Sequence, residues 1–400
     1  MVLASSSVEP QRTVAGQAEG RVLVAMSGGV DSSVAAALLH EQAVETVGVW
    51  MRLHDVADSY SEFKKSCCSL DASEDARRVA GQLGIPFYIL NLEREFGAGV
   101  LQPFLDAYQA GETPSPCVDC NSTVKFGALA GRARRLYDCQ AVATGHYARV
   151  DAIEEPDARG GRRYRLLKGR DPDKDQTYFL YGLRQDQLAH SRFPLGELTK
   201  PEVRDIARRH GLVTAEKPES QEICFVPGGD YRDALRERAG WRPTPGPLLD
   251  SDGRQVGEHA GAASYTIGQR QGLGVALGEP RYVARIDAAA NLVQLGRRED
   301  LARDAFVVRD ASFTAGRAPT GDAFDCEVRI RHRAAPAPAR VERLTADRPG
   351  IRGTWRVQVR ETVWAPAPGQ AAVWYDGDEV IGGGRIASEV PSVESPAAHA

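Results

Sequence analysis

The sequence contains no run of about 18 apolar residues, the shortest length that reads as a membrane-spanning helix. Its first twenty residues also lack the roughly 7- to 15-residue apolar core of a signal peptide. These two absences predict a protein that is neither exported nor inserted in a membrane. An excess of basic residues is missing too, because the formal net charge is -4. A protein that coats nucleic acid indiscriminately is therefore excluded, and any site for a polyanion must be local.

Cysteine is sparse, with seven in 400 residues, an odd number without the density of a secreted disulfide scaffold. This usage predicts reduced thiols and a cytoplasmic location. Small, polar and proline-bearing residues dominate 1–20 and 389–400, so we expect both ends to be disordered tails. The common kinase-type phosphate loop, G-x-x-x-x-G-K-[ST], is absent as well.

Apolar runs alternate with helical patterns from residue 21 onward, which is typical of a doubly wound α/β domain with a parallel sheet. We place this domain at 21–218, with a polar insertion after Val150. A glycine-rich stretch with short strands then predicts a small central α+β domain at 219–298. Alternation of period two at 299–388 predicts a C-terminal β-barrel, with a hairpin turn near Asp376 and Gly377. Helices are expected at 32–42, 73–83, 96–108, 122–136 and 200–210.

The motif "SGGVDSS", Ser27 to Ser33, interrupts the first apolar run and precedes the first helix. Its two glycines let the backbone approach an anion, and the helix beginning near Ser32 directs free N–H groups at that anion. Asp31 within an anion site makes sense if it holds Mg²⁺ against the phosphates. The alternative is a tight strand-to-helix turn that binds nothing. Two glycines, three serines and an aspartate at this position favour a phosphate site over such a turn.

This motif resembles the PP-loop of ATP pyrophosphatases, which cleave ATP between the α- and β-phosphates and adenylate an oxygen of the substrate. The same loop is found in synthetases for GMP, NAD and argininosuccinate. Further stretches narrow the resemblance to the tRNA-specific 2-thiouridylase family, from Arg21 to Ile386. They are "TPSPCVDCNSTVKF", "ATGHYARV", "KDQTYFL", "SQEICFVP", "YTIGQRQGLG" and "PGQAAVWYDGDEVIGGG".

The resemblance implies a fold with a PP-loop domain and a reaction that replaces the 2-oxygen of a wobble uridine with sulfur. It implies ATP and Mg²⁺ as cofactors, and a tRNA anticodon stem-loop and a persulfide-donating carrier protein as partners. ATP would contact Ala25, Met26, Ser27, Gly28, Gly29, Val30, Asp31, Ser32, Met51 and Gly145. The tRNA would contact Ser115, Pro116, Cys117, His146, Lys174, Asp175, Gln176, Arg331, His332 and Gln370.

Replacement of the uridine oxygen by sulfur is also suited to two thiols. A pyrimidine C2 oxygen leaves poorly, so ATP must first convert it into an adenylate that a sulfur nucleophile displaces. By the resemblance Cys224 carries the persulfide and Cys120 attacks it, leaving a disulfide. We expect Cys120 just before the helix of 122–136, whose N-terminus would lower its thiol pKa. Two thiols so far apart in the chain need a shared pocket, so the loop with Cys224 is expected to move.

Other interpretations of the cysteines stay open. Apolar "ICFV" also suits a buried core thiol at Cys224. Cys117-x-x-Cys120 could be a thioredoxin-type redox pair or half of a zinc site, and many family members carry aspartate where Cys117 stands. Ser115 stands where the family usually has asparagine. Four cysteines are expected to be structural, namely Cys67, Cys68, Cys139 and Cys326.

The strand pattern "CEVRIRHR" puts Arg329, Arg331 and Arg333 on one face, a local basic row suited to phosphates or simply a solvated face. The main functional hypothesis is thus a tRNA sulfurtransferase. A small-molecule amide-forming synthetase would need an ammonia source, and no glutaminase-like domain is evident. A non-enzymatic RNA-binding or redox protein would not need Asp31 and the loop glycines.

Overall fold

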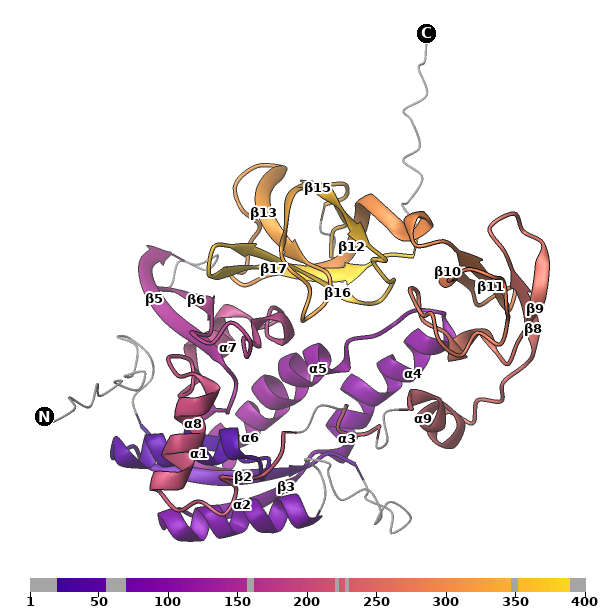
Figure 1. The fold of residues 1–400 in the computed structure, drawn as a ribbon. Helices are drawn as coiled ribbons and strands as arrows, with labels where there is room; N and C mark the ends of the chain where they lie inside the picture. The colour runs from indigo at the N-terminus through magenta and orange to yellow at the C-terminus, as the bar shows by residue number, and fades with distance from the viewer. Residues whose placement is uncertain are drawn as a thin grey trace, which may run out of the picture.

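The structure is a computed structural model that describes residues 20–54, 70–156, 162–219, 223–226, 230–346 and 352–388 (Figure 1). The two predicted tails, apart from Gly20, and the cysteines Cys67 and Cys68 lie outside these ranges. Three sheets build the fold, as predicted: a parallel sheet, a small central sheet and a C-terminal barrel. In the described part of the chain, no helix is both long and apolar enough to span a membrane.

The N-terminal sheet has the strand order β3-β2-β1-β4-β7, and every neighbouring pair is parallel. Its strands are β1 (Val22–Ala25), β2 (Thr46–Arg52), β3 (Phe87–Asn91), β4 (Ala141–Ala143) and β7 (Ser191–Arg192). The chain runs outward from β1 through β2 to β3, and then returns to the other side of β1 with β4. The crevice beyond the carboxyl ends of β1 and β4 is therefore a topological switch point, where ligands bind in such sheets.

Helices cover both faces of this sheet. Alternate residues of β1 point to opposite sides: Val22 and Val24 pack with α1, α2 and α8, whereas Leu23 and Ala25 pack with the segment from α3 to α6. The helices are α1 (Val30–Glu41), α2 (Leu70–Leu83), α3 (Glu93–Phe96), α4 (Gln102–Gln109), α5 (Pro116–Asp119), α6 (Ala130–Tyr137), α7 (Gln185–Ala189), α8 (Lys200–Arg209) and α9 (Tyr231–Arg238). Short 3₁₀ helices lie at Thr177–Phe179, Ala262–Ser264 and Glu299–Leu301.

Two predicted helices are more elaborate than their patterns indicated. The helix expected at 96–108 consists of α3, a π-helical turn at Gly97–Leu101 and α4. The helix expected at 122–136 begins at Pro116 instead, and runs through α5, a π-helical stretch at Cys120–Leu129 and α6. The predicted start was wrong because "TPSP" resembles a loop, whereas a proline at the first helical position is pre-organised for helix. π-Helical turns are rare and occur often at functional sites.

The barrel has the strand order β12-β15-β14-β13-β16-β17 and is closed by the pairing of β12 with β17. Its strands are β12 (Ala302–Phe313), β13 (Ala323–Arg329), β14 (Ala337–Arg343), β15 (Trp355–Trp364), β16 (Ala371–Asp376) and β17 (Glu379–Ile386). Aromatic rings of Phe313, Phe324, Trp355 and Trp374 fill its core. The predicted hairpin turn at Asp376 and Gly377 is confirmed.

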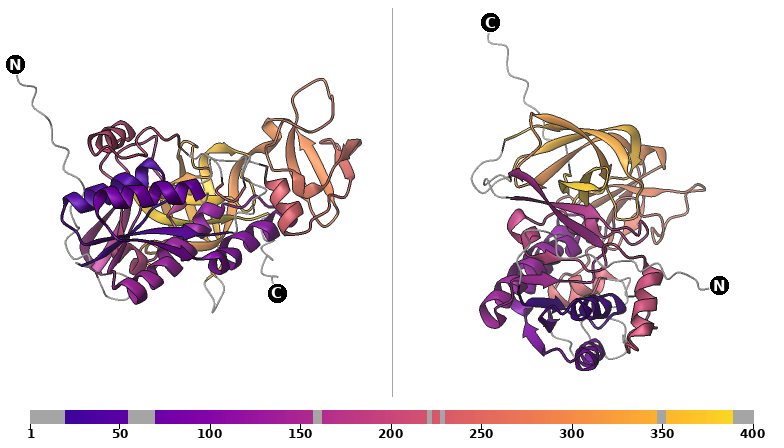
Figure 2. Two further views of the ribbon diagram at one scale, coloured as in Figure 1. Left: turned by 90° about the horizontal axis from the view of Figure 1, so that it is seen from below. Right: turned by 90° about the vertical axis from the view of Figure 1, so that its left-hand side faces the viewer.

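The polar insertion of the first domain joins that domain to the barrel. It forms a hairpin of β5 (Ala148–Pro156) and β6 (Arg162–Lys168), and β6 pairs with β17 of the barrel. This hairpin runs between the two bodies in the right-hand view of Figure 2. The central sheet has the order β10-β11-β8-β9, with β8 (Gly246–Leu249), β9 (Gln255–His259), β10 (Tyr282–Asp287) and β11 (Leu292–Gly296).

The switch point is packed backbone against backbone at Gly145, just after β4. A Cβ added there would lie 2.7 Å from the Asp31 carbonyl carbon and from the Ser32 nitrogen. We expect Gly145→Ala to lower the free energy of unfolding by about 1–3 kcal/mol, since neither backbone can give way freely. Thermal unfolding measures this change.

Gly131→Ala in α6 is the matched control, because no atom lies within 4 Å of the added Cβ. It should raise the free energy of unfolding by about 0.5–1 kcal/mol, since alanine favours helix over glycine. Equal midpoints for the two variants would contradict the close packing at Gly145.

Candidate active site

The loop between β1 and α1 is held in shape by its own serines. The Ser32 hydroxyl accepts a hydrogen bond from the Ser27 N–H at 3.1 Å and donates one to the Gly29 carbonyl at 3.1 Å, and Ser33 donates to the same carbonyl at 2.9 Å. Gly28 has φ +71°, and a Cβ there would lie 2.0 Å from the Ala72 carbonyl oxygen. Helix α1 begins at Val30, two residues before the predicted start, so its N-terminal N–H groups face this loop.

Asp31 forms an ion pair that the sequence did not predict. The Lys200 ammonium lies 2.7 Å and 2.9 Å from the two Asp31 carboxylate oxygens, and the Tyr147 hydroxyl donates to one of them at 3.0 Å. The Lys200 side chain is only 10% exposed. Burial and the nearby Asp31 carboxylate raise the pKa of Tyr147, so its hydroxyl stays protonated and donates.

The magnesium ion expected at Asp31 stays a prediction. Both carboxylate oxygens already contact an ammonium group, and Mg²⁺ prefers oxygen ligands in octahedral geometry. Within the described residues, no group of three or more His, Cys, Asp or Glu side chains is arranged to hold a metal ion. Lys200 is thus the present cationic partner of Asp31, and a Mg²⁺ ion held mainly by substrate phosphates would require Asp31 to exchange this partner.

The segment before Cys224 is tied to the same loop. Glu219 pairs with Lys200 at 2.8 Å and with Lys174 at 2.7 Å. Burial acts to raise the pKa of Glu219, but the two lysines outweigh it and lower the pKa to about 2. Lys217 donates to the Gly28 carbonyl at 2.9 Å and pairs with Asp75 at 2.6 Å. Lysine charges therefore surround the loop that was predicted to bind phosphates.

The "KDQ" residues, predicted to contact tRNA, connect three parts of the protein. Lys174 pairs with Glu219, as above. The Asp175 carboxylate, 2% exposed, pairs with Arg329 of the barrel at 3.0 Å, and its backbone carbonyl accepts a hydrogen bond from His332. The Gln176 side chain accepts a hydrogen bond from the Tyr147 N–H at 3.0 Å. The tRNA contact of Asp175 stays a prediction, and its buried carboxylate argues against it.

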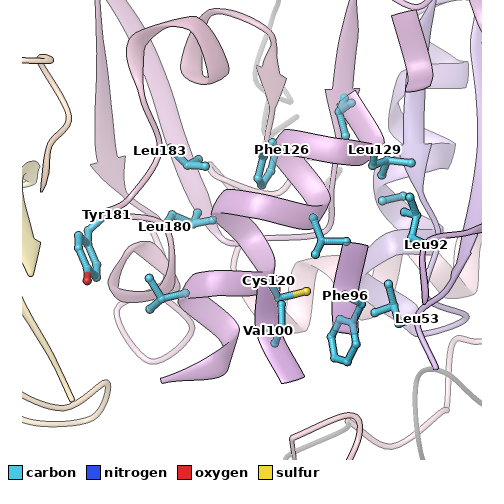
Figure 3. Close-up of a cluster of buried hydrophobic side chains, with 14 of the residues drawn as sticks. Leu53, Leu92, Phe96, Val100, Cys120, Phe126, Leu129, Leu180, Tyr181 and Leu183 are labelled. Atoms are coloured by element: carbon cyan, nitrogen blue, oxygen red, sulfur yellow. The ribbon is translucent and has the colours of Figure 1, made fainter. Parts of the chain in front are cut away.

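Cys120 and Cys224 belong to one apolar cluster. Cys120 is 8% exposed and lies among Phe96, Val100 and other buried side chains (Figure 3). Cys224 is half-buried against the same cluster, which Phe225 enters next to it in the chain. The apolar surroundings expected for Cys224 are confirmed, and both thiols adjoin the same cluster, whereas a pocket that both share stays a prediction.

The expected position of Cys120 at a helix N-terminus is wrong. The helix starts at Pro116, so exposed Cys117 occupies its first turn and Cys120 lies one turn farther in.

Two of the cysteines expected to be structural have raised pKa values. Burial, as the largest cause, raises the pKa of Cys139 to about 11 and that of Cys326 to about 12. These two thiols therefore remain protonated at neutral pH, in agreement with a structural role.

Other predicted site residues lie either near the carboxyl edge of the parallel sheet or at the start of the helix that carries Cys120. Gly145 lies against the loop, Met51 is half-buried at the end of β2, and His146 is hydrogen-bonded through Nδ1 to Thr144 at 2.7 Å. Burial, followed by the charge of Lys125, holds the pKa of His146 well below its usual value, so it is neutral. Ser115 and Pro116 are buried at the start of the cysteine helix, which runs from α5 to α6 and carries Cys117 and Cys120. Gln370 donates hydrogen bonds to the Thr113 and Pro114 carbonyls just before this helix.

The predicted basic row on one strand face is wrong, because β13 ends at Arg329. Arg329 turns inward to Asp175, and Arg331 donates to the Ala365 carbonyl at 3.0 Å while lying over the Trp364 ring. Arg333 is exposed. Four charged or polar residues of the site were missed from the sequence, because their partners are far away in the chain: Tyr147, Lys200, Lys217 and Glu219. The local signal for two of them was their position just before "SQEICF", where Lys217 and Glu219 stand.

Known proteins resemble this chain in sequence. Family models match at residues 20–228 (tRNA methyl transferase HUP domain), 233–297 (tRNA methyl transferase PRC-barrel domain) and 303–386 (aminomethyltransferase beta-barrel domain). A tRNA-specific 2-thiouridylase MnmA of Roseiflexus sp. is 49% identical over 92% of this chain and 100% of its own length. The chain belongs to the tRNA-specific 2-thiouridylase family.

A second member of this family, from Chloroflexus aggregans, is 49% identical over 92% of this chain and 98% of its own. Among solved structures, NMN synthetase from Francisella tularensis is 17% identical over 57% of this chain and 79% of its own, with a TM-score of 0.31. The names of the family models mention methyl transfer, whereas the curated relatives are named thiouridylases.

Replacing Lys200 with methionine should weaken ATP binding by at least about tenfold, because it leaves the Asp31 carboxylate unpaired beside the phosphates. Isothermal titration of ATP into the K200M variant measures this change. The double variant D31N/K200M is the control, since it removes both charges and should recover part of the affinity. ATP binding by K200M as tight as in the wild type would show that Lys200 does not compensate Asp31.

Proposed function

We propose that this protein is an ATP-dependent tRNA 2-thiouridine synthase that acts in the cytoplasm on a wobble uridine. The observation that carries the proposal is the joint location of the phosphate-type loop, at the switch point, and of Cys120 and Cys224, in one adjoining apolar cluster. The relatives at 49% identity carry the name of this activity. A reducing cytoplasm would keep both thiols available for catalysis.

The first half-reaction activates the uridine. The C2 oxygen attacks the α-phosphate of ATP, pyrophosphate leaves, and the oxygen becomes part of an AMP leaving group. The loop N–H groups and the ammonium groups of Lys174, Lys200 and Lys217 surround the crevice with the positive charge that a triphosphate requires. Pairing of each lysine with a carboxylate keeps this charge in place before ATP binds.

The second half-reaction transfers sulfur. Cys224 receives a persulfide from a sulfur-carrier protein, and the terminal sulfur of this persulfide attacks C2 and displaces AMP. The Cys120 thiolate then attacks the Cys224 sulfur, so that the transferred atom stays on uridine and a Cys120–Cys224 disulfide forms. A thiol reductant returns both cysteines to the starting state. The apolar cluster excludes water that would otherwise hydrolyse the adenylate.

The tRNA must present a flipped base to this crevice, and the anticodon loop can supply one because its bases are unstacked. Cys120 and Cys224 are both largely covered, so the base and the two sulfur atoms meet only if the residues around Cys224 shift. This movement remains a prediction of the proposal. The small-molecule synthetase has no use for two thiols beside one apolar cluster and is the less favoured alternative.

The proposal predicts that Cys120→Ser and Cys224→Ser each abolish tRNA thiolation while tRNA-dependent pyrophosphate release persists. The physical reason is that adenylation uses the loop, whereas sulfur transfer uses the thiols. Mass spectrometry of the tRNA and a pyrophosphate assay, with ATP, Mg²⁺ and a persulfide source, measure the two halves separately.

Cys139→Ser is the matched control, because Cys139 is also buried but bonds only locally, to the Tyr137 carbonyl. It should thiolate tRNA like the wild type. Full thiolation by either of the first two variants would remove that cysteine from the mechanism. Pyrophosphate release by the wild type that needs no tRNA would favour a small-molecule synthetase.

A further inference from the structure

The segment from Glu112 to Asp119, which includes the first turn of the cysteine helix, is held by contacts with the C-terminal barrel. Arg309 of β12 makes two contacts with the Glu112 carboxylate, at 2.6 Å and 2.9 Å. The Thr113 N–H donates to the Pro368 carbonyl at 2.7 Å. Gln370 donates to the carbonyls of Thr113 and Pro114, at 3.0 Å and 3.2 Å. Both the backbone and the side chains of this segment therefore depend on barrel residues.

The approach of the two bodies is close enough to require glycine. Gly369, between Pro368 and Gln370, has φ +83°. A Cβ at this position would lie 2.9 Å from the Glu112 Cβ and 3.1 Å from the Thr113 nitrogen. A side chain would strain the backbone and also separate the barrel from the segment.

The last of these contacts reaches the cysteines themselves. Arg385 of β17 pairs with Asp119, at 2.5 Å between Nη2 and Oδ1. Asp119 directly precedes Cys120 and follows Cys117 by two residues, and its side chain is 17% exposed. Burial raises the pKa of Asp119 and the Arg385 guanidinium counteracts this rise. The carboxylate is thus placed where it needs its partner on the barrel.

We propose that the barrel sets the position of the cysteine helix, and that Arg385 is a positioning residue that acts on Cys120 through Asp119. Removing the guanidinium leaves a largely buried carboxylate without its cation, which is strongly unfavourable. The turn of helix that carries Asp119 must then shift toward water, and Cys120 moves with it. A displacement of about 1 Å at a reacting group can cost about 100-fold in rate. The effect on thiolation rests on the function proposed above, whereas the effect on the position of Cys120 does not.

The first test therefore measures the position of Cys120 without any assay of activity. The rate of alkylation by N-ethylmaleimide is followed at Cys120, and at Cys139 as internal reference, by mass spectrometry of peptides from the reduced protein. We expect R385M to speed alkylation of Cys120 at least about tenfold, because the helix turn that buries it is no longer held. Alkylation of Cys139 should not change. R385K keeps the charge and should restore most of the protection.

R340M is the matched control, since Arg340 is an exposed arginine on strand β14 of the same barrel that pairs only with barrel residues. It should alkylate like the wild type. D119N/R385M, which has no unpaired charge, should be intermediate. Unchanged alkylation of Cys120 in R385M would overturn the proposal, and so would equal acceleration at Cys139, because that would indicate general unfolding.

The second test concerns the reaction. R385M should lose at least about tenfold in the rate constant of thiolation and keep tRNA-dependent pyrophosphate release, because the nucleotide loop is not part of this contact. Equal losses in the two half-reactions would contradict a role through Cys120. If the wild type released no tRNA-dependent pyrophosphate, the proposed function would fail, and the alkylation rates would still decide whether the barrel positions the cysteines.

Discussion

The arrangement of the active-site crevice depends on the ion pair between Asp31 and Lys200. An ammonium group that is 10% exposed needs a negative partner, and a carboxylate beside a triphosphate needs a positive one. Each charge therefore compensates the unfavourable free energy of placing the other at this site. Because Tyr147 bonds to Asp31 and Glu219 pairs with Lys200, four parts of the chain meet there: the start of α1, the residue before β5, the start of α8 and the segment before Cys224. A change of charge at Asp31 or Lys200 thus acts directly on Glu219, in the segment that leads to Cys224.

A second buried carboxylate connects this crevice to the barrel. Asp175 pairs with Arg329, while its neighbours Lys174 and Gln176 bond to Glu219 and Tyr147. Three consecutive residues thus contact the barrel, the Cys224 segment and the switch point. The β5–β6 hairpin adds a strand pairing across the same boundary. Domains that share buried ion pairs and backbone pairing do not reorient freely, so a tRNA that contacts the barrel contacts a body already fixed relative to the nucleotide loop.

Local patterns predicted much of this fold, and remote partners limited the prediction of the site. Continuous apolar runs such as "VLVAM" and "TVGVWM", which alternate with helical patterns, were enough for the parallel sheet, because both kinds of pattern are local properties. The start of the cysteine helix was missed since "TPSP" is compatible with both a loop and a helix with proline at its first position. The row Arg329, Arg331 and Arg333 was misread because a strand pattern cannot show where pairing ends. Lys200 lies 169 positions from Asp31, and no spacing rule relates two such residues.

The two halves of the crevice set opposite physical requirements. The proposed adenylation needs positive charge at the phosphates, which the lysines around the loop, each now paired with a carboxylate, would supply. The proposed sulfur transfer needs a dry environment, which the cluster around Cys120 would provide, yet burial in apolar surroundings raises the pKa of a thiol and disfavours the reactive thiolate. The first turn of the helix would have compensated this cost, but Cys117 occupies that turn. In the proposed reaction, the reactivity of Cys120 would then depend on how its helix turn is placed when the uridine and the persulfide arrive. The barrel contacts this part of the chain through Gln370 before the helix and Arg385 at Asp119. A change at the boundary between the barrel and this helix would for this reason alter the position of Cys120, next to Asp119 in the chain.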